Sequence, residues 1–100
     1  MAKFLIEVPH NEDELACMRA IESFVKSGNH FLAHAEWGCE DNEHKAWMIV
    51  ELESREQAIR ILPSMYRDRA KVTKLFHMTA EDVRRYKEKK RLRKTQGLAS

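Results

Sequence analysis

The fold is decided by the stretch Lys45-Ala46-Trp47-Met48-Ile49-Val50-Glu51-Leu52. Every second residue from Ala46 onward is apolar, whereas the residues between them mix lysine, tryptophan, isoleucine and glutamate. Successive side chains of a strand point to opposite faces of a sheet, so this pattern predicts a β-strand with one apolar face and one mixed face. The apolar face needs a layer of helices over it.

The same alternation predicts further strands at residues 4–8, 30–37 and 71–78. A polar, acidic segment at residues 38–43 has the length of a hairpin loop between the second and third strands. These elements therefore give four strands, of which the second and third are joined directly.

Capping residues predict where the helices begin and end. Asn11 followed by Glu14 begins a helix that Gly28 ends, and Ser54 followed by Gln57 begins a second helix. Both helices lie between predicted strands. The chain order is therefore strand, helix, strand, strand, helix, strand.

A last helix is predicted after the fourth strand. Thr79 and Asp82 form its cap, and the helix carries the basic residues 84–94. Residues 1–83 hold ten Lys and Arg against fifteen Asp and Glu, a net charge of −5, while residues 84–100 hold eight against one, a net charge of +7. The tail is therefore basic and the body acidic.

This element order is that of the ferredoxin-like βαββαβ arrangement, an α+β domain with an antiparallel sheet in the order 4-1-3-2 and two helices on one face. We expect this domain in residues 1–78 and a basic C-terminal helix and tail in residues 79–100. We also expect the first and third strands to be parallel neighbours, and the hairpin to pair Trp37 with His44.

Composition bounds the class of protein. A chain of 100 residues with 43% hydrophobic and 34% charged residues is typical of one globular domain. The sequence begins without the apolar stretch of about 7 to 15 residues of a secretory signal and holds no apolar run of about 18 residues for a membrane span. Cys17 and Cys39 form no CxxC pair, so we expect neither a disulfide framework nor a zinc finger. We therefore expect a cytoplasmic location.

Strand parity divides the sheet into two faces. The apolar set predicted to receive the helices consists of Phe4, Ile6, Val8, Phe31, Ala33, Ala35, Ala46, Met48, Val50, Val72 and Phe76. The other face, here called the mixed face, includes Leu5, Leu32, Trp47, Ile49 and Leu75 among charged and imidazole side chains. Such a patch is too apolar to face water. We expect a homodimer that stacks two mixed faces into an eight-stranded barrel around a small cavity.

The opening Lys3-Phe4-Leu5-Ile6-Glu7, together with the order of strands and helices, resembles the dimeric α/β-barrel superfamily over about residues 3–78. Small stand-alone members of that superfamily include nickel-binding proteins, monooxygenases and isomerases. The resemblance implies a homodimer with a site between the two sheets. No functional motif of the superfamily matches residue by residue.

The predicted ligand-binding residues share the mixed face; they are Glu7, His30, His34, Trp47, Glu51 and His77. With the expected hairpin, His34 lies opposite Trp47 and His30 opposite Glu51. Parallel first and third strands would place Glu7 toward the His30 end. The His30 and Glu51 pair can equally be a cross-strand ion pair without further function.

A metal site is predicted around the hairpin loop. His30 and His34 are four residues apart on a strand, about 13 Å, and cannot share one ion. The predicted donors are therefore His34, Cys39 and His44, with His77 as a further candidate. They suit nickel, copper or zinc better than magnesium or calcium. Cys39 can also be an inert loop cysteine.

Three functions follow. The first is a dimer that binds a transition metal or a small ligand between its sheets. The second is an isomerase or cofactor-free monooxygenase of the barrel type, with His34, or His30 paired with Glu51, as general base. The third is a nucleic-acid-associated protein acting through residues 84–94, which can also be a solvated helix.

Overall fold

The computed structural model describes residues 1–99, with side chains up to Arg91. It is an α+β structure whose sheet holds β1 (Ala2–Pro9), β2 (Glu36–Trp37), β3 (Lys45–Leu52) and β4 (Lys71–Leu75). The order across the sheet is β2-β3-β1-β4, which is β4-β1-β3-β2 when read from the other edge. β1 and β3 are therefore the central strands.

All neighbouring strands run antiparallel, including β1 and β3, in which Ala2 lies opposite Leu52 and Pro9 opposite Lys45. The prediction that the first and third strands are parallel is therefore wrong. The physical reason is connectivity: the helical crossover returns β2 parallel to β1, and the hairpin then reverses the chain, so that β3 runs against both.

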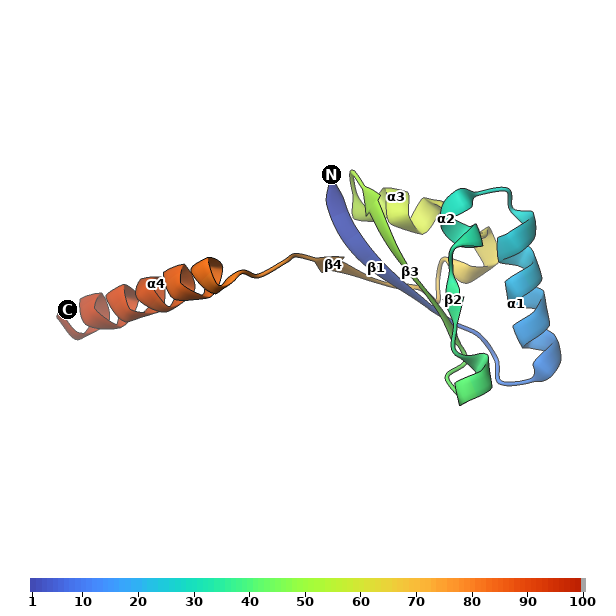
Figure 1. Ribbon diagram of the computed structural model, residues 1–100, viewed down its shortest axis with the longest axis horizontal. Helices are drawn as coiled ribbons and strands as arrows, with labels where there is room; N and C mark the ends of the chain where they lie inside the picture. The colour runs from blue at the N-terminus through green and yellow to red at the C-terminus, as the bar shows by residue number, and fades with distance from the viewer. Residues whose placement is uncertain (100) are drawn as a thin grey trace.

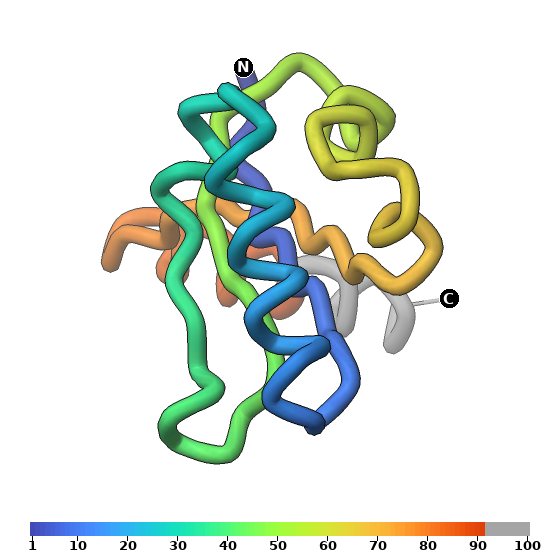
Figure 2. The backbone as a smooth tube through the Cα atoms, turned by 90° about the vertical axis from the view of Figure 1, so that its right-hand side faces the viewer, coloured from blue at the N-terminus to red at the C-terminus, as the bar shows by residue number. Residues whose placement is uncertain are grey.

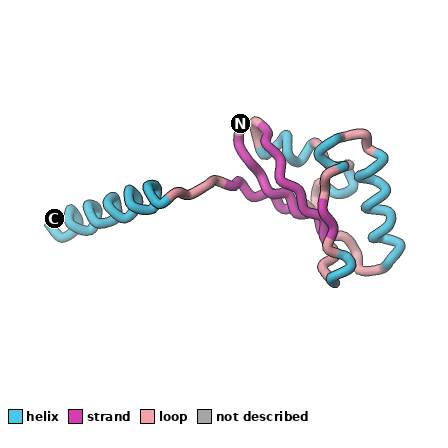
Figure 3. The backbone as a smooth tube through the Cα atoms, in the orientation of Figure 1, coloured by secondary structure: helices cyan, strands magenta, loops and turns pink. Residues whose placement is uncertain are grey.

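Helices cover one face of this sheet. α1 (Glu14–Lys26), α2 (His30–Ala33) and α3 (Arg55–Arg60) lie together on one side of the strands (Figure 1). Figure 2 looks onto this layer, with α1 crossing in front of β1 and β3. Colouring by secondary structure shows the same separation of helices from strands (Figure 3). The opposite face of the sheet carries no helix within residues 1–99.

The core lies between the two layers. The central strands contribute side chains that are at most 5% exposed: Phe4, Ile6, Val8, Ala46, Met48 and Val50. The helix layer contributes Ala20, Phe24, Ala58 and Leu62, each at most 2% exposed. The predicted apolar face is thus confirmed for β1 and β3. Phe76, which parity assigned to it, follows β4 and is 77% exposed.

Residues 30–37 are not one strand, as the alternation predicted. The Asn29 side chain accepts hydrogen bonds from the backbone N–H groups of Phe31 and Leu32, at 2.9 and 3.4 Å, and so caps the short helix α2. Only Glu36 and Trp37 join the sheet, and Trp37 pairs with Ala46 rather than with His44. Leu32 was predicted on the mixed face. Because it lies in this turn of helix, it is instead in the core, where it is 2% exposed.

Capping predictions hold for the later helices. The Ser54 hydroxyl accepts from the Gln57 N–H at 3.2 Å, and the Gln57 side chain accepts from the Glu53 N–H at 2.9 Å. The first helix is capped by Asp13 instead of Asn11, with its carboxylate 2.8 Å from the Ala16 nitrogen. Asp13 takes this place because its own backbone is extended while residue 14 is already helical.

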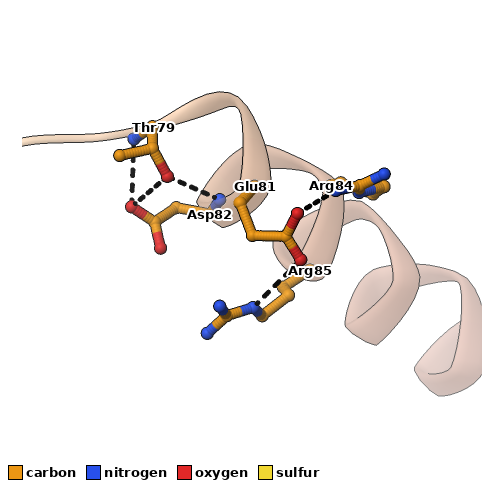
Figure 4. Close-up of polar contacts among 5 residues, drawn as sticks. All are labelled: Thr79, Glu81, Asp82, Arg84 and Arg85. Atoms are coloured by element: carbon orange, nitrogen blue, oxygen red, sulfur yellow. Dashed lines mark hydrogen bonds and ion pairs between the residues drawn. The ribbon is translucent and has the colours of Figure 1, made fainter.

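The last helix, α4 (Ala80–Ala99), projects away from the sheet and the other helices (Figure 1). Thr79 caps it reciprocally: Asp82 N donates to the Thr79 hydroxyl at 3.1 Å, and Thr79 N donates to the Asp82 carboxylate at 3.0 Å (Figure 4). Glu81 pairs with Arg84 and Arg85 on the next turn. The predicted basic helix is confirmed at the level of backbone and cap, while the side chains of residues 92–94 and the placement of residue 100 lie outside the described part.

The cap makes α4 sensitive to acid. Hydrogen bonds from the backbone N–H and the hydroxyl of Thr79, with a smaller contribution from His77, hold the pKa of the Asp82 carboxyl below its usual value. A lowered folded-state pKa means that the cap contributes fully above the ordinary aspartate pKa, and that this contribution is lost as the pH falls through the lowered pKa.

We expect Thr79→Val to raise the pKa of Asp82 part of the way toward its usual value, because the hydrogen bond from the hydroxyl disappears while the one from the backbone N–H remains. Carbon-13 NMR of the Asp82 carboxyl against pH measures this. Thr73→Val, in β4, serves as the control and should leave the titration unchanged. Equal Asp82 titrations in the two variants would contradict the cap.

Candidate metal centre

The pairing of the central strands brings His10 and His44 together. His10 follows Pro9 at the end of β1, and His44 precedes Lys45 at the start of β3. The His10 N–H donates to the His44 carbonyl at 3.0 Å, which continues the antiparallel register one step beyond the Pro9 and Lys45 pair. The two imidazole centroids are 5.9 Å apart, edge to face.

Cys39 reaches the same place from the hairpin loop. It begins the 3-10 turn Cys39–Asp41, which is closed by Asp41 N and Glu43 N donating to the Gly38 carbonyl, both at 3.0 Å. Asn42 then takes the left-handed conformation, with φ of 63°, that turns the chain back into β3. This compact loop places Cys39 Sγ 3.2 Å from His10 Nε2.

The ligand atoms of His10, Cys39 and His44 all lie within 4.8 Å of one another, close enough to bind a single ion. His10 is buried, and the other two residues are partly buried. The His44 Nδ1 atom is shielded from solvent and has no hydrogen-bond partner among the described residues. Buried polar nitrogens normally have a hydrogen-bond partner, so the Nδ1 atom of His44 is available to a further ligand.

The contact with Asn11 selects the tautomer of neutral His10. Its Nδ1 lies 3.0 Å from the backbone carbonyl of Asn11. A carbonyl oxygen only accepts, so Nδ1 carries the proton, and neutral His10 presents a bare Nε2 lone pair toward Cys39. A carbonyl that fixes the distal ring nitrogen is the usual support of a metal-ligating histidine.

Cys39 has a second partner. The structure joins it to Cys17 of α1 in a disulfide that spans 22 residues of sequence. The expectation of no disulfide framework is therefore wrong: the sequence separates the two cysteines, but α1 packs over the end of the sheet where the hairpin loop begins. Cys39 can act as a thiolate ligand only when this bond is reduced.

The structure brings together only part of the set of metal ligands predicted from the sequence. Cys39 and His44 come together as expected, but their third partner is His10. His34 caps the end of α2 and is exposed; it lines a hollow of about 390 Å³ on the mixed face together with Leu5, Glu36, Trp47 and Ile49.

The predicted ligand-binding residues are spread over the molecule. Trp47 donates its indole N–H to Glu7 at 3.2 Å, and the two residues face each other across β1 and β3. Glu51 and His77 line a second, open hollow of about 870 Å³ at the far end of these strands. Glu7 therefore lies away from Glu51, contrary to expectation, because β1 and β3 are antiparallel.

His30 lies outside both hollows. It is exposed on α2, where its ring rests 4.1 Å from that of Phe31. The expected cross-strand pair of His30 with Glu51 does not form, because residue 30 is helical rather than part of the strand beside β3.

The sequence does contain a signal for His10. It directly follows the first strand, His44 directly precedes the third, and antiparallel central strands bring those two ends together. The parallel pairing assumed from the sequence moves them to opposite ends of the sheet.

Gly38 tests how closely the hairpin loop that carries Cys39 packs against Trp47. A Cβ atom there would lie 2.6 Å from Cζ3 of Trp47 and 2.7 Å from the Glu43 carbonyl oxygen. We expect Gly38→Ala to cost about 1–3 kcal/mol of unfolding free energy and to shift the Trp47 indole N–H resonance. Gly28→Ala is the control: its φ of +77° makes it costly too, but no atom approaches it within 4 Å, so the Trp47 signal should stay. An unmoved signal in Gly38→Ala would contradict the packing.

Comparisons with protein families, with curated proteins and with solved structures found no match to this chain. Within the described residues, no helix is long and apolar enough to cross a membrane. The chemistry of the His10, Cys39 and His44 group is therefore the main guide to function.

Proposed function

We propose that this protein binds a transition metal ion through His10, Cys39 and His44. The observation that carries the proposal is the convergence of three donor atoms within 4.8 Å from three separate segments: the end of β1, the hairpin loop and the start of β3. Two imidazoles and a thiolate favour zinc, copper or nickel over magnesium and calcium, which prefer oxygen.

For the reduced protein, a simpler interpretation is a hydrogen bond from the Cys39 thiol to His10 Nε2, with no ion. It accounts for the 3.2 Å contact between those two atoms. It leaves unexplained the buried, unpartnered Nδ1 of His44. A bound ion would use imidazole lone pairs of this kind. The unpartnered nitrogen of His44 supports the proposal for that reason.

We expect the reduced protein to bind one zinc or nickel ion per chain. Replacing His10 or His44 with Ala should weaken metal binding by at least about tenfold, because each substitution removes one of the proposed imidazole ligands. Competition titration against a chromophoric chelator under anaerobic conditions measures the affinity. His34→Ala is the matched control, since His34 is exposed and outside the group.

Two results would decide against this assignment. One is a reduced wild-type protein that binds no metal. The other is an affinity that falls in His34→Ala but not in His10→Ala, which would return the site to the residues predicted from sequence.

We also propose that the fold is ferredoxin-like and that the protein is a dimer of the α/β-barrel type. The observation that favours a dimer is the uncovered mixed face: Ile49, in the middle of central strand β3, is 62% exposed. The same face carries Lys3 and Lys71 as well as Glu7 and Glu51, and a surface with both signs of charge can complement a second copy of itself across a two-fold axis. A small ligand would occupy the hollow beside Trp47.

A charge at the centre of that face tests the dimer. We expect Ile49→Glu to give a monomer with an unchanged circular dichroism spectrum, measured by sedimentation equilibrium. Leu15→Glu, at a 60% exposed position of α1 on the helix side, should remain dimeric. A wild-type monomer at the same concentrations would contradict the dimer.

A further inference from the structure

We infer that Cys17 is a fourth ligand of the same centre, and that the metal ion and the Cys17–Cys39 disulfide are alternative states of it. This inference rests on the proposed metal function. It assigns the site a closed set of two thiolates and two imidazoles, and it makes binding dependent on the redox state of one cysteine pair.

The position of Cys17 supports this assignment. It lies on the helix that packs over the sheet and is 9% exposed, and its Sγ directly adjoins that of Cys39. Cys39 Sγ in turn lies 3.2 Å from His10 Nε2. The Cys17 sulfur therefore adjoins one ligand of the proposed ion, although it lies outside the group of three residues whose ligand atoms are all within 4.8 Å of one another.

The backbone spacing of the pair is wide for a disulfide. The Cα atoms of Cys17 and Cys39 are 7.2 Å apart, whereas disulfide-bonded cysteines have Cα atoms about 4.4 to 6.8 Å apart. Two thiolates that share a zinc ion, each about 2.3 Å from it, lie farther apart than two bonded sulfurs. The scaffold is thus suited to both states, and the reduced state needs no closer approach of α1 to the loop.

The four donors come from segments that the fold fixes separately. His10 ends β1, Cys17 lies on α1, Cys39 begins the 3-10 turn and His44 leads into β3. Two cysteines and two histidines around one ion are a closed tetrahedral set typical of structural zinc. An ion held this way would tie α1 and the hairpin loop to the sheet, which the disulfide does in the oxidised state.

The two states exclude each other because both use the Cys39 sulfur. In the disulfide, neither cysteine offers a thiolate, and only His10 and His44 remain as donors. Two imidazoles alone hold a zinc-class ion much more weakly than the full set of four. Oxidation therefore releases the metal, and reduction restores the site.

A low-molecular-weight disulfide is a sufficient oxidant. The partly exposed Cys39 thiolate attacks one of its sulfurs, forming a mixed disulfide and releasing one small thiolate. The buried Cys17 thiolate then attacks Cys39 Sγ, which forms the internal disulfide and releases the second small thiolate. Two electrons pass from the cysteine pair to the oxidant, and the metal ion leaves with its charge unchanged.

Cobalt(II) is a suitable probe, because thiolate-to-cobalt charge-transfer absorption reports the number of sulfur ligands. We expect reduced wild-type protein to bind one cobalt ion. Cys17→Ser should keep cobalt bound through the other three ligands, with the charge-transfer intensity per bound ion roughly halved and the affinity at least about tenfold lower. Cys39→Ser should show the same losses.

The second arm needs no substitution, so it stands even if a variant fails to fold. Wild-type protein is oxidised with oxidised glutathione until no free thiol is detected, and is then titrated with cobalt. We expect at least a hundredfold loss of affinity, which dithiothreitol should reverse.

The outcomes separate the two proposals. Reduced wild-type protein that binds no cobalt overturns the metal function itself. Cobalt binding with an unchanged charge-transfer intensity in Cys17→Ser removes Cys17 from the ligand set. Equal affinity of the oxidised and reduced proteins overturns the exclusion between disulfide and metal while leaving the metal function in place.

Discussion

The antiparallel pairing of β1 with β3 is the constraint on which the rest of the structure depends. It aligns the apolar side chains of both strands on one face, where α1 and α3 bury them, and it leaves the other face open. It also sets which chain ends meet. The step of the ladder after Pro9 and Lys45 is His10 and His44, so the same register that builds the core assembles the candidate metal centre.

The hydrophobic pattern was enough to predict most of the sheet. Strict alternation in β1 and β3 gave the correct buried face, because both strands lie flat against the helix layer. Residues 30–37 alternate as well, yet the Asn29 side chain satisfies the backbone N–H groups that begin a helical turn. A short alternating segment therefore does not distinguish a strand from a capped turn of helix followed by a short strand.

The candidate metal centre was predictable only in part. Cys39 and His44 are close in sequence, so the hairpin loop alone brings them together. His10 and Cys17 lie much earlier in the chain. The placement of His10 depends on the direction of the strands, and that of Cys17 depends on how α1 packs. His34 was included because of an assumed strand register, and that register does not exist in the folded chain.

The proposed site would join the hairpin loop to α1 and to the end of the sheet. The hairpin loop is held by a few backbone hydrogen bonds and by the contact of Gly38 with Trp47. The disulfide at Cys39 anchors this loop to α1, and a metal ion would also anchor it to the end of the sheet. Loss of both would free the loop while the core between sheet and helices remained packed.

X-ray absorption spectroscopy of the reduced, zinc-loaded protein tests the central claim most directly. We predict a first coordination shell that contains both sulfur, at about 2.3 Å, and imidazole nitrogen, at about 2.0 Å. A shell made only of oxygen and nitrogen atoms, without sulfur, would contradict the assignment of the ion to this centre.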